Sequence, residues 1–155
     1  MKLLRELFHL LTHHAFPTNS HGHALTRHLQ VLSAQTLPTG LEILLRLPPA
    51  SLPVNEDGFV QRTALCTVLD LSTSVTAWMS SPNQHISLSV GMDFAFLRDI
   101  DFNRELIVKA TCLDRNQAVA HTLAEVRQEE VLVATMHHTV FYMNETVKEV
   151  FRLSD

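Results

Sequence analysis

A long helical run with almost no charge is the feature that most constrains the fold of this chain. Residues 63–79 (TALCTVLDLSTSVTAWM) are mostly apolar, and Asp70 is the only charged residue between Arg62 and Asp93. A helix this apolar is not an ordinary solvent-facing helix, so other elements must surround it. A carboxylate in apolar surroundings costs free energy unless it is paired, hydrogen-bonded or used in chemistry. Asp70 is therefore the first candidate for a functional residue.

The composition bounds the class of protein. With 155 residues and 46% hydrophobic content, the chain is long enough for one domain with a substantial buried core. Its net charge of -4 and the lack of any cluster of Lys and Arg argue against binding to nucleic acid or to an anionic membrane. No apolar stretch reaches the roughly 20 residues that span a bilayer, so we expect no stable membrane insertion.

The cysteines and the N-terminal segment bear on the compartment. Cys66 and Cys112 lie among apolar neighbours and form no disulfide or ligand pattern, which is typical of reduced thiols in an intracellular protein. We therefore expect a cytoplasmic protein. Residues 1–16 have an amphipathic pattern, so a mitochondrial presequence is the alternative.

The chain divides into a helical N-terminal part and one mixed domain. Residues 2–15 are predicted to form a helix that ends before Pro17, and a weaker helical segment follows at about 23–30. The expected parts are an N-terminal helical extension, a main domain and a C-terminal tail, which cover residues 1–30, 31–143 and 144–155.

The main domain has an α+β pattern. Strands are predicted at 31–35 and 41–47, and the long helix at about 62–80. At 86–96, apolar residues alternate with small or polar ones over eleven positions, so one face of this strand should be apolar. Three more strands, linked by short polar turns, should complete a four-strand antiparallel meander with it; they are 105–113, 118–127 and 131–142.

One helix between a strand pair and a meander indicates a specific layout. A curved antiparallel sheet wrapped around a single central helix would bury the apolar faces of both. The helix residues expected in this core are Leu65, Val68, Leu69, Val75 and Trp78.

Three segments of the chain resemble one family. They are the loop 55–63 (NEDGFVQRT), Asp70 on the helix, and the strand segment 89–98 (SVGMDFAFLR). In order and spacing they are similar to hotdog-fold acyl-CoA thioesterases of the phenylacetate-degradation and thioesterase superfamily member 2 type. The resemblance covers roughly residues 30–143. It implies the α+β hotdog fold, and hydrolysis of an acyl-CoA thioester to free acid and CoA without a cofactor.

The resemblance also implies roles for individual residues. Asp70 would act as general base on water, or less readily as nucleophile, at the thioester carbon. Asn55, which leads the loop that contains Gly58, would position water or the carbonyl. Ser89 would support the aspartate, and Arg98 would meet a phosphate of CoA.

The sequence departs from the family pattern at the start of the helix. Gln61-Arg62-Thr63 stands where the family has His-Gly-Gly, whose glycine N–H polarises the thioester carbonyl. Arg62 or Thr63 can still supply a backbone donor, helped by the helix N-terminus. Gln61 would line the substrate path at this point, and the Arg62 side chain would crowd it.

The spacing on the helix favours a dimer. The helix start and Asp70 are about eight residues apart, roughly 12 Å at 1.5 Å per residue, so one chain cannot bring both to one carbonyl. The family's solution, as the resemblance implies, is a homodimer in which the helix start of one subunit faces the aspartate of the other. A dimer of dimers is the expected further assembly.

Several alternatives remain open at this stage. Asp70 could be a structural carboxylate bonded by hydroxyls on its own face, and Asn55 an ordinary turn residue. Ser89 could be a small residue that lets helix and sheet approach, and Arg98 an exposed strand-end arginine. The alternative function is a catalytically impaired hotdog module that binds acyl-CoA or a protein partner. A hydratase is disfavoured because position 61 is Gln and no histidine accompanies the helix acid.

The ten histidines do not predict a metal site. Six of them occur as adjacent or alternating residues, at 13–14, 21 and 23, and 137–138, without cysteine or carboxylate partners at ligand spacing. Neighbouring strand residues point to opposite faces, so His137 and His138 are poorly placed to share one ion.

Overall fold

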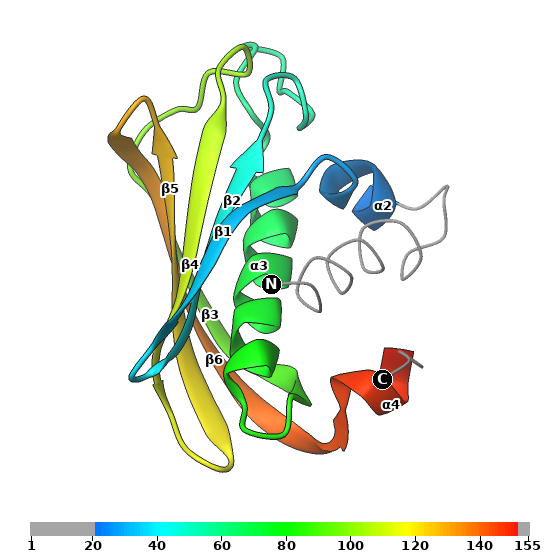
Figure 1. The fold of residues 1–155 in the computed structure, drawn as a ribbon. Helices are drawn as coiled ribbons and strands as arrows, with labels where there is room; N and C mark the ends of the chain where they lie inside the picture. Colours follow the sequence, from blue (N-terminus) through cyan, green and yellow to red (C-terminus); the bar gives the residue numbers. More distant parts are fainter. Residues whose placement is uncertain (1–20, 152–155) are drawn as a thin grey trace.

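The computed structural model describes residues 21–151, which form one antiparallel sheet of six strands around a long helix (Figure 1). The layout expected from the sequence is therefore confirmed. In chain order the elements are α2 (His21–Thr26), β1 (Gln30–Leu37), β2 (Gly40–Leu47), α3 (Arg62–Ser80), β3 (His85–Phe96), β4 (Leu106–Arg115), β5 (Val119–Gln128), β6 (Val131–Thr146) and α4 (Val147–Phe151).

Helix α3 lies at the centre of the fold because most of its surface is apolar. It has 19 residues, and its bounds confirm the predicted helix. Four of its five expected core residues are fully buried, namely Leu65, Val68, Leu69 and Val75. Burying one such side chain contributes about 1.5–3 kcal/mol. Trp78 is partly buried against the same core, and its Nε1 donates a hydrogen bond to Ser87 Oγ at 2.9 Å.

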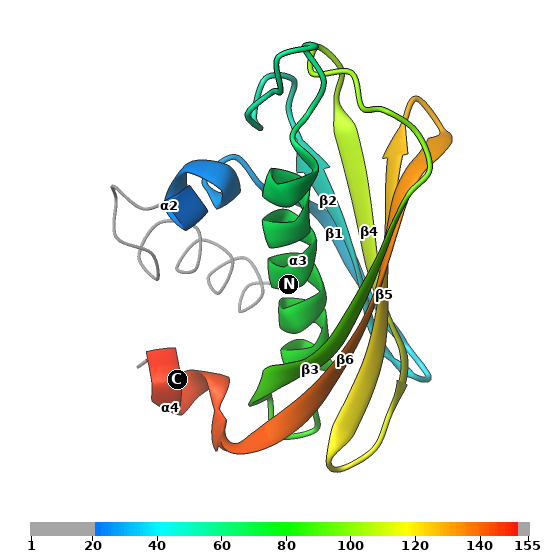
Figure 2. The ribbon, with the colours of Figure 1, turned by 180° about the vertical axis from the view of Figure 1, so that it is seen from behind.

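The sheet supplies the other half of the core. Seen from behind, it curves around α3 and leaves its outer face open (Figure 2). Alternate residues of four strands point inward and are completely buried; they include Ile43, Leu45, Val108, Val126 and Met136. This period of two is what the side-chain alternation of a strand produces when one face is covered.

The strand order corrects one prediction. The sheet runs β1-β2-β4-β5-β6-β3, so β3 pairs with β6 and not with β4. The meander therefore has three strands, β4 to β6, and the predicted four-strand meander is wrong. The connection between β3 and β4 is nine residues long (97–105), which lets the chain cross from one edge strand to the interior of the sheet.

Strand β3 also departs from its predicted alternation. Its pairing with β6 shifts register twice, between His85 and Ser87 and again between Ser89 and Gly91. A bulge leaves one residue unpaired and reverses which face the following side chains occupy.

The bulges divide β3 into two parts. Leu88 and Val90 lie 58% and 68% exposed, whereas Phe94 and Phe96 pack against the core around α3. The prediction of one continuous apolar face is therefore wrong for the first part of the strand, because the bulges were not visible in the periodicity.

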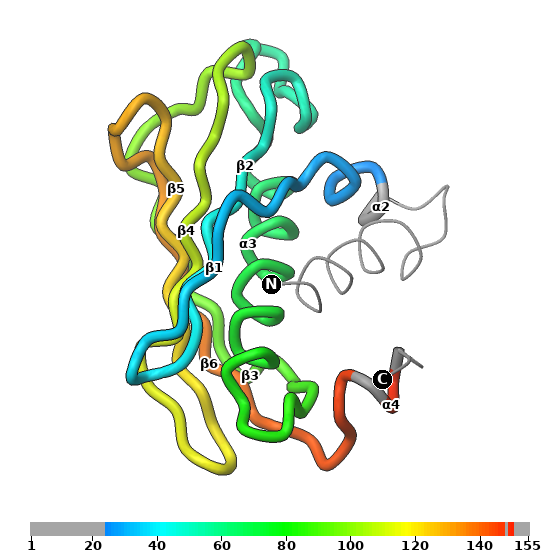
Figure 3. The backbone as a smooth tube through the Cα atoms, viewed as in Figure 1, coloured from blue at the N-terminus to red at the C-terminus, as the bar shows by residue number. Residues whose placement is uncertain are grey.

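The short helices α2 and α4 lie on the same side of the sheet as α3 (Figure 3). Helix α2 is shorter than the predicted segment at 23–30 and ends at Thr26. Strand β6 continues past residue 143, the expected end of the main domain, to Thr146. The helix predicted at 2–15 lies outside the described residues.

Candidate active site

A pocket of about 400 Å³ lies at the start of α3, and we call it the loop pocket. Its lining residues are Asn55, Phe59, Val60, Gln61, Arg62, Thr63 and Asp99. Four of the residues predicted from the sequence as site residues are thus neighbours in space. Asp70, Ser89 and Arg98 do not line it, so the structure divides the predicted site into two regions.

The loop before α3 is a compact turn built around Asn55. Its side-chain Oδ1 accepts hydrogen bonds from the backbone N–H groups of Asp57 (3.1 Å) and Phe59 (2.9 Å). Gly58 has a φ of 84°, a left-handed conformation that favours glycine. The carboxamide oxygen of Asn55 therefore has a structural role in the turn, while its side chain lines the loop pocket.

Gln61 joins this turn to the helix. It is the N-cap residue of α3, yet its side chain makes no capping bond and its Nε2 donates to the carbonyl of Val54 at 2.9 Å. The carbonyl of Gln61 accepts the N–H groups of Ala64 and Leu65.

The first two N–H groups of α3 remain available. No described residue accepts a hydrogen bond from the backbone N–H of Arg62 or Thr63, and both residues line the loop pocket. Free N–H groups and the helix dipole make this end of α3 favourable for an oxygen atom that carries negative charge.

The side chain of Arg62 lies over the same pocket. Its guanidinium donates to Asp99 Oδ1 at 3.3 Å and sits 5.3 Å from the centre of the Phe96 ring. Both charged side chains are about 60% exposed. An ion pair this exposed contributes little to stability, so the side chain is free to leave it.

Asp70 lies on the one side of α3 that the protein does not bury. The residues of this side follow each other at helical spacing and we call them the open stripe: Thr63, Cys66, Thr67, Asp70 and Ser74. The Asp70 side chain is 44% exposed within the single chain. Thr73, three residues after Asp70, is completely buried.

Two groups approach the Asp70 carboxylate. The hydroxyl of Ser74 donates to Oδ1 at 3.4 Å, and Nε2 of His138 lies 3.9 Å from the same oxygen. The statement that no histidine accompanies the helix acid is therefore wrong. His138 comes from β6, and its contact with Asp70 was not predicted because it depends on the packing of elements that are distant in the chain.

His138 is enclosed between the helix and the sheet. Its Nδ1 lies 2.8 Å from Thr73 Oγ1, and its side chain has no exposed surface. Burial lowers the pKa of the ring below the ordinary value of 6.5, although the Asp70 carboxylate partly opposes the shift. A buried ring cannot contact a substrate, so this histidine does not support the hydratase alternative. His137 is exposed on the other face, as the strand argument predicted.

Ser89 and Arg98 occupy different positions around β3. Ser89 pairs with the buried Val140, two residues from His138 along β6, so it shares the inner face with His138. Its side-chain hydroxyl forms no hydrogen bond with a described residue. Arg98 is exposed just beyond the end of β3, as predicted, and its backbone N–H donates to the carbonyl of Val133 at 3.3 Å.

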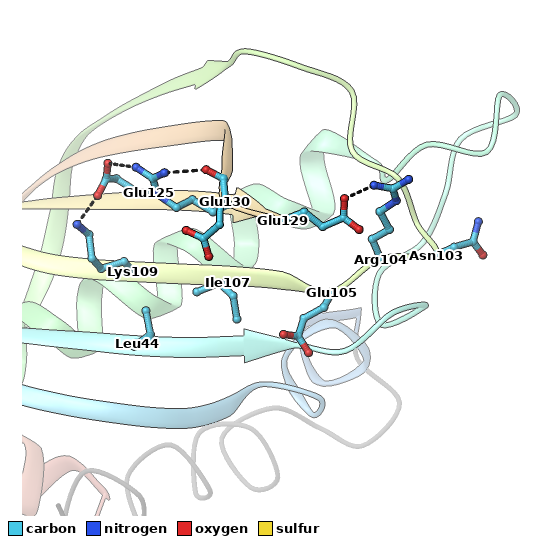
Figure 4. Close-up of a pocket in the computed structure, with 10 residues that line it drawn as sticks. Leu44, Asn103, Arg104, Glu105, Ile107, Lys109, Glu125, Glu129 and Glu130 are labelled. Carbon is cyan, nitrogen blue, oxygen red and sulfur yellow. Dashed lines mark hydrogen bonds and ion pairs between the residues drawn. The ribbon is translucent and has the colours of Figure 1, made fainter.

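A larger hollow, of about 570 Å³, lies on the outer face of the sheet (Figure 4). Five of its seven charged side chains pair with one another: Glu125 with Lys109 and Arg127, and Glu129 with Arg104. Because the sheet separates it from α3, this hollow has no access to Asp70.

The described residues contain no group of three or more side chains that could hold a metal ion. In the same part of the chain, no helix is both long and apolar enough to cross a membrane.

Comparison with solved structures identifies proteins that share this architecture. The chain superposes on zebrafish thioesterase superfamily member 2 with a TM-score of 0.73 and 17% identity, over 92% of this chain and 97% of that one. A phenylacetic acid degradation-related protein from Ralstonia eutropha gives a TM-score of 0.67 and 20% identity, over 87% and 98%. The chain has the hotdog fold.

A third hotdog-fold structure adds information on a ligand. It is a Streptococcus mutans protein bound to acetyl-CoA, with a TM-score of 0.67 and 12% identity, over 86% of this chain and 97% of that one. No protein-family model matches the chain, and no curated protein matches it. At these identities the comparisons establish the fold, and the activity has to be argued from the site.

Proposed function

We propose that this protein is an acyl-CoA thioesterase that acts as a homodimer, with Asp70 as general base. One observation carries the proposal: α3 has free N–H donors at its start and an open carboxylate two turns later on its unburied side. The first can stabilise a developing oxyanion and the second can take a proton from water. Together they are the two functions that thioester hydrolysis requires.

The reaction proceeds in two steps. Asp70 takes a proton from water as the water oxygen bonds to the carbonyl carbon, and the carbonyl oxygen becomes an oxyanion held by the N–H groups of Arg62 and Thr63. The C–S bond then breaks, and the CoA thiolate takes the proton from Asp70. Free acid and CoA leave, the carboxylate is regenerated, and no cofactor is consumed.

The two functions must come from different chains. Arg62 and Asp70 are eight residues apart on one straight helix, or about 12 Å. A two-fold axis makes two α3 helices antiparallel, so that the start of one faces the later part of the other. Each of the two sites then combines the loop pocket of one subunit with Asp70 of its partner.

The free edge of β3 supports this dimer. Its outer edge pairs with no described strand, and residues 88–93 are all exposed. Leu88, Val90 and Met92 are 58%, 68% and 42% exposed. A long apolar edge is a liability unless another strand covers it. Pairing of β3 with the β3 of a second copy would continue the sheet and set the open stripes of the two helices against each other. A further dimer of dimers is part of the proposal.

Acyl-CoA is the proposed substrate class. The S. mutans protein with the same fold is bound to acetyl-CoA. Arg98 is an exposed cation just beyond β3, which suits it to a phosphate of CoA. Ser89, on the inner face of β3, is placed to support the water or the carboxylate.

A second candidate function rests on Arg62. Its side chain lies at the pocket where the family pattern has glycine, and Asp99 and Phe96 hold it there. If this arrangement persists with substrate bound, the protein binds acyl-CoA without turnover. The site would then serve a binding module.

A thiol-release assay separates the two candidates. Purified protein is tested against acyl-CoA esters of short, medium and long chain and against aryl-CoA esters. The Asp70→Asn variant is assayed in parallel. Turnover that Asp70→Asn abolishes is the expected result. Saturable binding of these esters without any thiol release would establish the binding module instead.

A further inference from the structure

His138 is a buried polar side chain with an unpaired nitrogen. No described residue forms a hydrogen bond with its Nε2, and the side chain is 0% exposed. Buried polar atoms in folded proteins nearly always have a partner, so an orphaned one beside a functional carboxylate requires an explanation. Asp70 Oδ1 lies 3.9 Å away, too far for a hydrogen bond in the resting structure.

The partner of the other ring nitrogen fixes the position of the proton. Thr73 Oγ1 has one hydrogen, which it donates to the helix backbone: the carbonyl of Leu69 lies at 2.8 Å and that of Asp70 at 3.2 Å. Four other hydroxyls of α3 do the same to the carbonyl four residues earlier. Nδ1 of His138, 2.8 Å from Thr73 Oγ1, must then be the donor of that bond. In a neutral ring this leaves Nε2 without a hydrogen and able only to accept.

The surroundings keep the ring neutral. Met92 of β3 and Thr122 of β5 flank it in the sheet, Thr73 and Asp70 face it from α3, and Asp70 is the titratable group among these four. Burial lowers the pKa of His138 more than the carboxylate raises it. An unprotonated Nε2 therefore faces the Asp70 carboxylate 3.9 Å away, and no hydrogen bond joins them.

We propose that His138 is a positioning residue for Asp70, which accepts a hydrogen bond from its carboxyl group once Asp70 has taken the proton from water. This inference rests on the proposed thioesterase function. In the resting state the two acceptors do not bond. After proton transfer the Asp70 O–H is a donor, and the half-exposed side chain is free to close the gap to Nε2. When the proton passes to the leaving thiolate, the bond is released.

Such a bond favours the reaction because it exists only after the proton has moved. An interaction made in the transition state and intermediate, but not in the resting enzyme, raises kcat without tightening substrate binding. The same contact would have no kinetic effect if His138 only filled the space between helix and sheet.

Two variants and one control test this. His138→Phe keeps a ring of similar shape without an acceptor, and we expect kcat to fall about ten- to a hundredfold with little change in KM. His137→Phe, the same change on the exposed face, should match the parent. Thr73→Val removes the partner of Nδ1 and lets the ring adopt the other tautomer, so kcat should fall as well. Parent-like kcat in both His138→Phe and Thr73→Val would overturn the proposal.

Nitrogen NMR of the histidine rings provides a readout that needs no substrate. At pH 7 we expect the ¹⁵N shifts of His138 to report a protonated Nδ1 and an unprotonated Nε2; the opposite tautomer would overturn the proposal. An enzyme that hydrolyses esters while His138→Phe keeps full kcat contradicts this inference alone. A parent that hydrolyses no ester contradicts the proposed function on which the inference rests.

Discussion

The two ends of the proposed site lie on one helix and are built in opposite ways. At the loop pocket, three of the four predicted side chains are already engaged: Asn55 closes a turn, Gln61 holds the loop, and Arg62 lies against Asp99 and Phe96. The groups that remain free there are the backbone N–H groups of Arg62 and Thr63. At Asp70 the reverse holds, because the helix backbone is fully bonded and the carboxylate is open.

From this difference we expect the two regions to tolerate sequence change differently. A backbone N–H is supplied by any residue except proline, so Gln61-Arg62-Thr63 can replace His-Gly-Gly without removing the donors. A general base depends on one side chain, and Asn in place of Asp removes it. The account therefore predicts that substitutions act through the backbone at one region and through the side chain at the other.

The largest effect is expected from Asp70→Asn. It keeps the size of the side chain and removes the proton acceptor, so kcat should fall by about 10²–10⁴. Asp93→Asn is the matched control, because Asp93 is exposed and pairs with His137 on the outer face of the sheet. Steady-state thiol release measures both, and equal rates for Asp70→Asn and the parent would remove Asp70 from the mechanism.

The second prediction compares two changes at Arg62. Proline suits this position, which is the first of the helix and follows the extended Gln61, but it has no N–H. Arg62→Pro should lower kcat by about 10²–10³ through the loss of an oxyanion donor. Arg62→Ala keeps the donor and clears the pocket, so its rate should equal or exceed that of the parent. If Arg62→Ala lowers kcat as much as Arg62→Pro does, the Arg62 side chain and not its backbone N–H contributes to catalysis.

A smaller effect is expected at the turn that supports the loop pocket. Gly58 has a positive φ, and a Cβ there would meet nothing within 4 Å. The cost of Gly58→Ala is therefore backbone strain alone, about 1 kcal/mol of unfolding free energy. Urea denaturation measures it, with Gly91→Ala as the control at a glycine that has the same open space. A loss of several kcal/mol of unfolding free energy would mean that the turn stabilises the fold as well as shaping the loop.

The smallest expected effect is on the pH dependence of the protein's stability, and it comes from His138, which lies beside Asp70. The pKa of His138 is lowered by burial, with Asp70 opposing, so below its ordinary value of 6.5 the unfolded chain binds the proton more readily than the folded one. Its contribution to stability is complete above pH 6.5 and is lost as the pH falls toward the folded value. Comparison of thermal unfolding at pH 7.5 and 5.5 should show a smaller loss in His138→Phe than in the parent. His28, whose pKa is also lowered by burial, is present in both proteins and cancels.

The sequence predicted the elements better than their pairing. Periodicity located α3 to the residue and the strands nearly so, because burial of one face imposes the pattern locally. It missed the bulges at Ser87 and Gly91 and the place of β3 beside β6, since both depend on which strand is the neighbour.

The candidate site shows the same limit. Asn55, Gln61, Arg62 and Thr63 were predicted together from the family resemblance of the loop 55–63, and they line one pocket in the structure. His138 was missed because its approach to Asp70 follows from the packing of β6 on α3. Adjacent histidines of opposite exposure, on an alternating strand, were the available signal that one of them faces inward.

The central claim is that each site is shared between two chains. Asp70→Asn and Arg62→Pro subunits can be co-expressed with different tags, and the mixed dimer isolated through both. One of its two sites would then combine an intact Asp70 with an intact helix start. The account predicts about half of the parent rate from two inactive variants, as a two-fold dimer with shared sites requires. A mixed dimer as inactive as its parts would place the whole site within one chain and contradict the account.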